Sequence, residues 1–230
     1  PLPENHEPQQ DEPEAIRQLL EQRRFKKMAR DTYTDEQWRM HRWAYCRLTE
    51  MVDSQIARVL EALRTSGQEQ NTLVIFTSDH GDLDSAHKME HKTAFYEEAC
   101  RVPLIISQPG VTSAGVRANL VSNGLDLLPT LCDYAGIEPP ADLTGTSLRP
   151  LAEGAQSVTS REFIPLESEI GKMIVTESYK YMLYDDGKNR EQLIDLKNDP
   201  GETKSVAAEP GHRDALNKHG ELFAQHFGGV

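Results

Sequence analysis

The chain has 230 residues, 37% of them hydrophobic, and a formal net charge of −12. This negative balance argues against a general nucleic-acid binder, because phosphate backbones are held by patches of Lys and Arg. It also makes tight binding to an anionic membrane surface unfavourable. The apolar runs are only a few residues long, so the sequence predicts no transmembrane helix.

The N-terminal part of the chain predicts a loop followed by helices. Residues 1–13 are rich in Pro, Glu and Gln and indicate an extended loop, and residues 13–30 indicate a short helix. Thr34 is expected to cap a longer helix, in which apolar residues recur every three or four positions as far as Leu63. Gly67 is expected to end this helix.

The middle of the chain predicts buried strands. Residues 72–77 and 102–106 are continuous apolar runs without alternation, which favours strands buried on both faces, as in a parallel sheet. Residues 125–135 predict a helix that ends at Gly136. Helices that alternate with such strands indicate an α/β domain.

The C-terminal part has a different pattern. Short apolar segments separated by turn residues such as Asp185-Asp186-Gly187-Lys188 predict a small antiparallel sheet followed by a closing helix over 214–227. The expected strands are 163–166, 173–176, 180–184 and 192–195. We therefore expect two domains, residues 1–152 and residues 153–230.

A polar segment, Ser78-Asp79-His80-Gly81-Asp82, directly follows the first predicted strand. Ligand sites in open α/β sheets lie at the carboxyl ends of the strands, where an acidic side chain can hold a cation. Gly81 allows a sharp turn and a close backbone approach. Taken alone, the pattern is more typical of a turn capped by Asp79.

Neighbouring motifs favour a functional role for residues 78–82 over a simple turn. Lys92 lies thirteen residues after Asp79, and a run from Tyr96 to Ile106 contains Tyr-Glu-Glu and Arg-Val-Pro. Together these features resemble the sulfatase family of the alkaline phosphatase superfamily. Four other blocks resemble the same family in the same order, namely residues 45–63, 121–137, 145–151 and 179–202.

The resemblance implies an alkaline-phosphatase-like α/β fold, with a mixed, mainly parallel sheet and flanking helices, completed by a small C-terminal antiparallel sheet with a helix. It implies hydrolysis of sulfate esters of a small molecule or glycan. A phosphodiester or phosphonate monoester hydrolase of the same superfamily is one alternative. A non-catalytic binding domain built on the same fold is another, although the presence of Asp79, His80 and Lys92 argues against it.

The resemblance also implies roles for particular residues. Asp79 and His80 would be metal ligands, for Ca²⁺ or else Mg²⁺. Lys92 would be a catalytic residue that contacts a sulfate oxygen as a fixed positive charge. His87 is a second catalytic candidate, for which support of the loop is the more typical role. His91 is expected to contact substrate, and a solvated loop position explains it equally well.

The family's nucleophile is a formylglycine made from the Cys or Ser of a Cys/Ser-x-Pro-x-Arg motif. Cys46, Cys100 and Cys132 lack the Pro, and no Ser fits the motif. We therefore expect a fragment whose nucleophile lies before Pro1, and whose first partner is the missing N-terminal part of the same protein. The substrate, oligomeric state and cellular compartment stay open.

Overall fold

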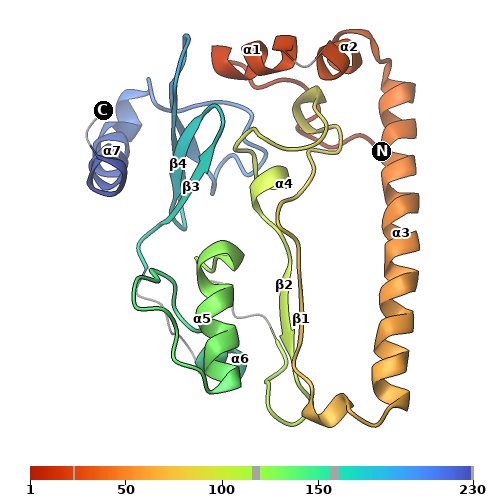
Figure 1. Cartoon of the computed structure of the whole chain (residues 1–230). Coiled ribbons are helices and arrows are strands. Elements are labelled where there is room, and N and C mark those ends of the chain that lie inside the picture. Colours follow the sequence, from red (N-terminus) through yellow and green to blue (C-terminus); the bar gives the residue numbers. More distant parts are fainter. Residues whose placement is uncertain (23, 116–119, 156–160, 229–230) are drawn as a thin grey trace. The chain divides into compact units, whose positions relative to one another are not determined.

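A computed structural model of the chain describes residues 1–22, 24–115, 120–155 and 161–228 (Figure 1). The contacts divide the chain into two compact units. Unit 1 consists of Pro1–Cys46, His80–Arg101 and Phe163–Val230, and unit 2 consists of Arg47–Asp79 and Val102–Glu162. The domain boundary expected at residue 152 stays a prediction.

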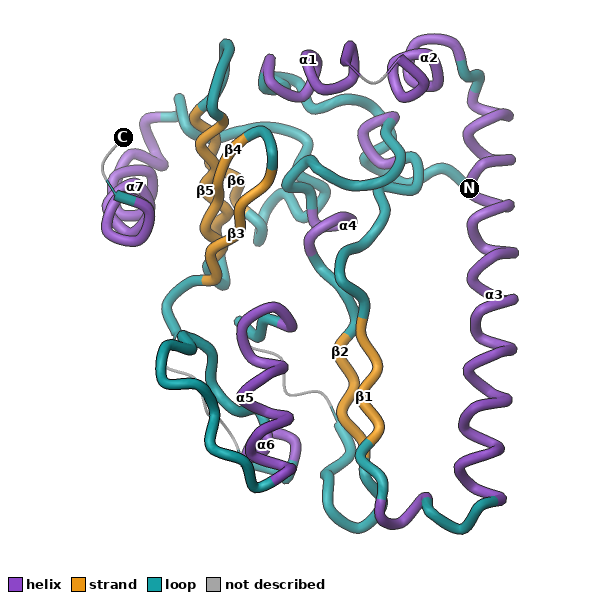
Figure 2. The backbone as a smooth tube through the Cα atoms, in the orientation of Figure 1, coloured by secondary structure: helices purple, strands orange, loops and turns teal. Residues whose placement is uncertain are grey.

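Unit 1 is built on a four-stranded antiparallel sheet in the order β3–β4–β5–β6, shown as neighbouring strands in Figure 2. Helix α7 (Arg213–Phe227) contacts β4 and β5. The predicted C-terminal antiparallel sheet and closing helix are therefore confirmed. The strands are β3 (Ile164–Ser168), β4 (Gly171–Val175), β5 (Tyr179–Tyr184) and β6 (Glu191–Asp195).

The N-terminal segment of unit 1 is a loop, as expected, and it leads into α1 (Glu14–Gln22) and α2 (Arg24–Thr32). Apolar residues of α1 join the core that covers one side of the sheet. The same core contains residues of the segment 83–99, including Phe95 and Tyr96, which are almost fully buried. Hydrophobic burial of these side chains fixes the segment after Asp79 against the C-terminal sheet.

Helix α3 (Asp35–Thr65) begins as the sequence predicts. The backbone N–H of Gln37 donates to Thr34 Oγ1 at 3.3 Å, and Gln37 Oε1 accepts from the Thr34 N–H at 2.8 Å, which is a capping box. Trp38 is 1% exposed. Most of the expected apolar stripe is instead exposed in this structure, including Met51 and Val59.

Unit 2 contains a two-stranded sheet of β1 (Val74–Thr77) and β2 (Leu104–Ser107). These strands pair antiparallel, with Val74 opposite Ser107, so the parallel arrangement expected of them is wrong for this pair. They are also less buried than expected, since Phe76 and Ile105 are exposed. The apolar composition of a strand does not fix the direction of its neighbour, which depends on the connection between the two strands.

Unit 2 also contains α5 (Asn123–Ala135) and α6 (Arg149–Ala152). Ser122 caps α5 through its side chain, and the helix ends at Gly136, whose φ of 65° is left-handed, as the sequence predicts. Short helices complete the chain: Glu69–Asn71, Ala86–Lys88, α4 (Glu97–Cys100) and Pro210–His212. In the part of the chain that the structure describes, no helix is both long and apolar enough to cross a bilayer.

Asp126 of α5 is fully buried and makes several charge-assisted hydrogen bonds within unit 2. Its carboxylate accepts hydrogen bonds from Arg161 at 2.6 and 2.8 Å and from the backbone N–H groups of Ser122 and Thr146. Burial raises the pKa of Asp126, but the hydrogen bonds from Arg161 and from the two backbone groups outweigh burial and leave this pKa below its usual value.

We expect Asp126→Asn to lower the free energy of unfolding at neutral pH by about 3 kcal/mol, because Arg161 loses its buried partner. A depressed carboxyl pKa adds stability above the pKa of the unfolded chain, about 3.9, and this stability is lost as the pH falls through the folded value. Urea titrations should therefore show a large difference between variant and wild type at pH 7 that shrinks at about pH 3. A difference independent of pH would contradict this account.

Candidate functional site

The segment after β1 is held at its first residue by α5. The side-chain amide of Asn123 donates to the Ser78 carbonyl oxygen at 2.5 Å, within unit 2. Asp79 follows as the last residue of the first segment of this unit, and its side chain is exposed. The residue that follows the strand therefore presents its carboxylate to solvent, and its role as a cation ligand stays a prediction.

His80 and Gly81 belong to unit 1. The Gly81 N–H donates to the Ala99 carbonyl at 2.8 Å, which ties this turn to α4. His80 Nδ1 lies 2.8 Å from the Gly81 carbonyl oxygen, which can only accept, so Nδ1 carries a proton and the lone pair of the neutral ring lies on Nε2. This orientation by a backbone carbonyl is typical of histidines that ligate a metal through Nε2.

Gly81 is required by packing at this turn. A Cβ at this position would lie 1.9 Å from the Glu98 carbonyl oxygen, a distance that no side chain can adopt. We expect Gly81→Ala to lower the free energy of unfolding by about 3 kcal/mol through overpacking. Gly211→Ala is the matched control, because a Cβ there meets nothing within 4 Å. Equal denaturation midpoints for the two variants would contradict the close approach.

The loop between Asp82 and Ala94 is unusually strained. Asp82 Oδ1 accepts from the Asp84 N–H at 2.9 Å and starts the turn. Positive φ angles then recur at six residues that are not glycine, Asp84, Ser85, His87, Lys88, His91 and Thr93. Such angles cost free energy and concentrate at functional sites, and at a β-branched residue like Thr93, with a φ of 110°, they are rare.

His87 is completely buried, below the surface of this loop. Its ring stacks on Tyr96 with centroids 3.7 Å apart, and its Nε2 lies 3.4 Å from the Asn5 amide nitrogen. Burial, with the nearby positive charges of Arg30 and Lys180, lowers the pKa of His87 to about 4. A neutral, buried imidazole supports the loop and does not present a positive charge to a substrate. The catalytic role expected for His87 stays a prediction.

His91 and Lys92 are both exposed. His91 Nε2 lies 3.9 Å from the carboxylate of Glu90, which is itself buried and lies 4.0 Å from His41 Nδ1. The side chains at 91 and 92 are therefore accessible to a substrate, whereas Glu90 lies beneath them. The substrate contacts expected for His91 and Lys92 stay predictions.

The sequence did not predict the buried lysine, Lys180, that contacts the residues directly after this loop. Lys180 of β5 is fully buried, and its Nζ donates to Glu202 at 2.6 Å, to Glu97 at 2.8 Å and to the Phe95 carbonyl at 2.7 Å. Burial lowers the pKa of Lys180, but the carboxylates of Glu202 and Glu97 outweigh burial and raise it, so Lys180 stays charged. The Tyr-Lys-Tyr and Pro-Gly-Glu motifs mark these positions without indicating their contact.

The N-terminal loop is a second support that the sequence did not reveal. Asn5 donates to Glu98 Oε1 at 2.7 Å and to the Gly201 carbonyl at 3.0 Å, and its own carbonyl accepts from the His87 N–H at 2.8 Å. His6 Nδ1 donates to the Ser85 carbonyl at 2.7 Å. Residues predicted as an extended loop thus fix the strained segment.

The implied cation can be compared with the donors present. Within residues 1–22, 24–115, 120–155 and 161–228, no group of three or more His, Cys, Asp or Glu side chains is arranged to hold a metal ion. The exposed Asp79 carboxylate is a donor of the kind that Ca²⁺ prefers, and the oriented His80 Nε2 is a nitrogen donor of the kind that ligates metals. Ca²⁺ takes six to eight ligands, so these two donors need others to complete a site.

Cys100 does not resemble an activated nucleophile. Cys46, Cys100 and Cys132 are free thiols. Burial raises the pKa of Cys100 to about 12, so its thiol stays protonated at neutral pH.

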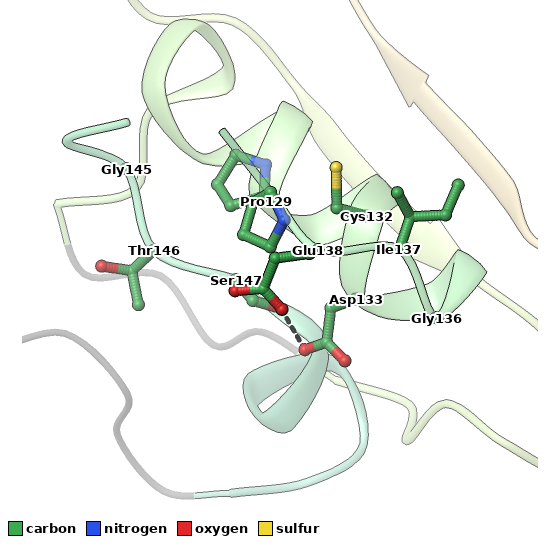
Figure 3. A pocket seen from close by; sticks show the side chains of 10 residues that line it. Pro129, Cys132, Asp133, Gly136, Ile137, Glu138, Gly145, Thr146 and Ser147 are labelled. Atoms are coloured by element: carbon green, nitrogen blue, oxygen red, sulfur yellow. Dashed lines mark hydrogen bonds between the residues drawn. The ribbon is translucent and has the colours of Figure 1, made fainter. Parts of the chain in front are cut away.

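A shallow pocket of about 520 Å³ lies elsewhere, in unit 2 (Figure 3). The end of α5 and the loop up to Ser147 form its wall, and Ser147 Oγ donates to Asp133 at 2.6 Å. None of the residues described in its wall is a predicted site residue, so the pocket offers no support for the candidate site.

Comparisons with known proteins indicate the same family as the motif around Asp79 and Lys92. The sulfatase family model matches residues 3–137, and the model of the N-sulphoglucosamine sulphohydrolase C-terminal region matches residues 85–225. The chain is 37% identical over 202 residues to a Delta 4,5-hexuronate-2-O-sulfatase of Bacteroides thetaiotaomicron, covering 83% of the chain and 42% of that protein. The chain thus spans less than half of this relative's length.

Two solved structures extend the comparison. A 2-O GAG sulfatase superposes with a TM-score of 0.88 at 33% identity, over 98% of the chain and 51% of that structure. A phosphonate monoester hydrolase of Silicibacter pomeroyi superposes with a TM-score of 0.76 at 26% identity, over 85% of the chain and 42% of that structure. The fold is therefore that of the sulfatases and of the alkaline phosphatase superfamily, to which they belong.

Proposed function

The chain belongs to the sulfatase family, and we propose that it supplies the part of a sulfuric ester hydrolase active site that holds a cation and the sulfate group. The observation that supports this most is the turn after β1, where Asp79 is exposed and His80 Nδ1 donates to the Gly81 carbonyl, which leaves Nε2 as the ring nitrogen that could bind a cation. The nucleophile would come from residues outside these 230. "Intact enzyme" below means the protein that contains both parts.

Each candidate site residue has a specific role in this proposal. Asp79 and His80 would hold the cation, Ca²⁺ or else Mg²⁺, which when bound neutralises charge on the sulfate group. Lys92 would place its ammonium against a non-bridging oxygen, where negative charge increases as the sulfur is attacked. His91 would contact the remainder of the substrate. His87, buried beneath the loop, would hold its shape.

We propose a sulfated carbohydrate as the substrate class. The relative at 37% identity is named for a hexuronate sulfate, and the structure with a TM-score of 0.88 is a GAG sulfatase. The exposed His91 and Lys92 offer hydrogen-bond donors and positive charge to a polyanionic sugar. Aryl sulfates and phosphonate monoesters are the competing substrates.

The test compares kcat/KM of the intact enzyme for three esters: a 2-O-sulfated unsaturated uronate disaccharide, 4-nitrophenyl sulfate and phenyl phosphonate monoester. We expect the sulfated disaccharide to be the best substrate. A clear preference for the phosphonate would overturn the sulfatase assignment and favour the alternative supported by the phosphonate hydrolase structure. Hydrolysis of none of the three would favour a non-catalytic binding domain.

A further inference from the structure

Lys180 is a lysine with no exposed surface, although it lies in a sheet remote in sequence from the candidate site. Two of its three partners, the Phe95 carbonyl and the Glu97 carboxylate, belong to the segment that runs from Lys92 into α4. The third, Glu202, is 1% exposed and accepts the Glu97 N–H through its second oxygen at 2.5 Å. Lys180 therefore binds the side chain of Glu97, the first residue of α4, and Glu202 binds its backbone N–H.

Helix α4 is in direct contact with the turn at His80 and Gly81. The Ala99 carbonyl accepts from the Gly81 N–H at 2.8 Å, and the Glu98 carbonyl lies where a Gly81 Cβ would be. The Gly81 carbonyl in turn orients the His80 ring. A displacement of α4 would consequently move the backbone that directs His80 Nε2. Phe95, whose carbonyl accepts from Lys180, precedes α4 and lies three residues after Lys92.

Stability alone is a poor explanation for this cluster. Desolvation of an ammonium and two carboxylates costs several kcal/mol per ion, and apolar residues of similar volume often stabilise such a place equally well or better. The ion cluster instead fixes direction, because each hydrogen bond has a required angle and distance. Glu202 also adopts a φ of 54°, a strained conformation that its contacts must maintain.

We propose that Lys180 and Glu202 are positioning residues, through which the C-terminal sheet sets the orientation of His80 and the place of Lys92 by way of α4. The mechanical link to Gly81 stands on the contacts alone, whereas its importance for metal binding and turnover rests on the proposed function. Asn5, which donates to Glu98, would assist from the N-terminal loop.

The link is tested first in the 230-residue chain by amide hydrogen exchange. Lys180→Met removes the charge and all three donated bonds, and Glu202→Gln is the milder variant, which keeps an oxygen for the Glu97 N–H. We expect the amide of Gly81 and the α4 amide of Arg101, which bonds to the Glu97 carbonyl, to exchange at least about tenfold faster in either variant. The Glu202 variant decides the question if the Lys180 variant does not fold.

The control is Asp126→Asn, which breaks a buried ion pair in unit 2. It should destabilise the chain and leave Gly81 and Arg101 exchange unchanged. Exchange of Gly81 at the wild-type rate in the folded Glu202→Gln variant would overturn the link. So would equal acceleration in Asp126→Asn at matched global stability.

The second test uses the intact enzyme, with Ca²⁺ affinity and steady-state kinetics as readouts. We expect Glu202→Gln to weaken Ca²⁺ binding and to lower kcat by about 10- to 100-fold, as for other residues that orient metal ligands, with a smaller change in KM. A purely structural role would give the same values as Asp126→Asn of matched stability, and that result would overturn the proposal. A wild-type enzyme that hydrolyses no ester refutes the proposed function instead, and the exchange experiment still decides the link.

Discussion

Lys92→Ala is expected to lower kcat of the intact enzyme by about 10²-fold or more, with a smaller effect on KM. The reason is that the ammonium at 92 meets charge that grows on the sulfate oxygens between ground state and transition state. Lys92 is exposed and follows a strained loop that Phe95 and Lys180 anchor, so its removal leaves the core intact. Steady-state kinetics and a thermal melt of the same sample would separate the two effects.

Lys88→Ala is the control for Lys92. Lys88 lies in the same loop, at a positive φ, and forms an ion pair with the exposed Glu7 at 2.7 Å. An exposed pair of this kind contributes little to stability, so the variant should keep near-wild-type kinetics. If Lys92→Ala retains full turnover, or if both variants lose the same activity, then Lys92 does not contact the reacting group.

Asp79→Ala is expected to reduce Ca²⁺ affinity and turnover of the intact enzyme together, each by at least about 100-fold. A carboxylate is the strongest ligand this turn offers to a hard cation, and the neighbouring His80 nitrogen is a weak substitute for it. Because the Asp79 side chain is exposed, its loss removes little packing. Calorimetric titration with Ca²⁺ and activity at saturating Ca²⁺ are the measurements.

Asp53→Ala provides the matched control for Asp79. Asp53 is an exposed carboxylate on α3, so its removal changes the net charge by the same amount without touching the turn after β1. We expect this variant to bind Ca²⁺ like the wild type. Undiminished Ca²⁺ affinity in Asp79→Ala would remove this residue from the metal site.

Local signals in the sequence predicted local structure well. The Thr34–Gln37 capping box, the left-handed Gly136 and the turn at 185–188 follow from hydrogen-bonding and backbone preferences of a few neighbouring residues. The sulfatase motif is equally readable from the sequence, because Asp79, Lys92 and the other blocks keep a fixed order along the chain, and the family it indicates is confirmed.

Features that depend on residues far apart in the chain could not be predicted. The antiparallel pairing of β1 with β2 is set by the path of the chain between them, which the composition of either strand leaves open. A lysine in an alternating strand normally faces solvent, so Lys180 gave no signal of burial. Its partner Glu202 is 22 residues away, and their contact exists only in the folded chain.

His87 shows the limit of the motif itself. A histidine between the candidate metal ligands and Lys92 is a reasonable catalytic residue by type and spacing, but the sequence does not tell which way its ring points. The positive φ of 52° and the stack on Tyr96 direct the ring into the core.

The most direct test of the proposed cation and sulfate site is a crystal structure of the intact enzyme with Ca²⁺ and a slowly hydrolysed sulfate ester. We expect a cation at about 2.3–2.6 Å from an Asp79 oxygen and bound by His80 Nε2, with Lys92 Nζ at about 2.7–2.9 Å from a sulfate oxygen. A cation held by other carboxylates, with Asp79 and His80 facing solvent, would contradict the proposed site.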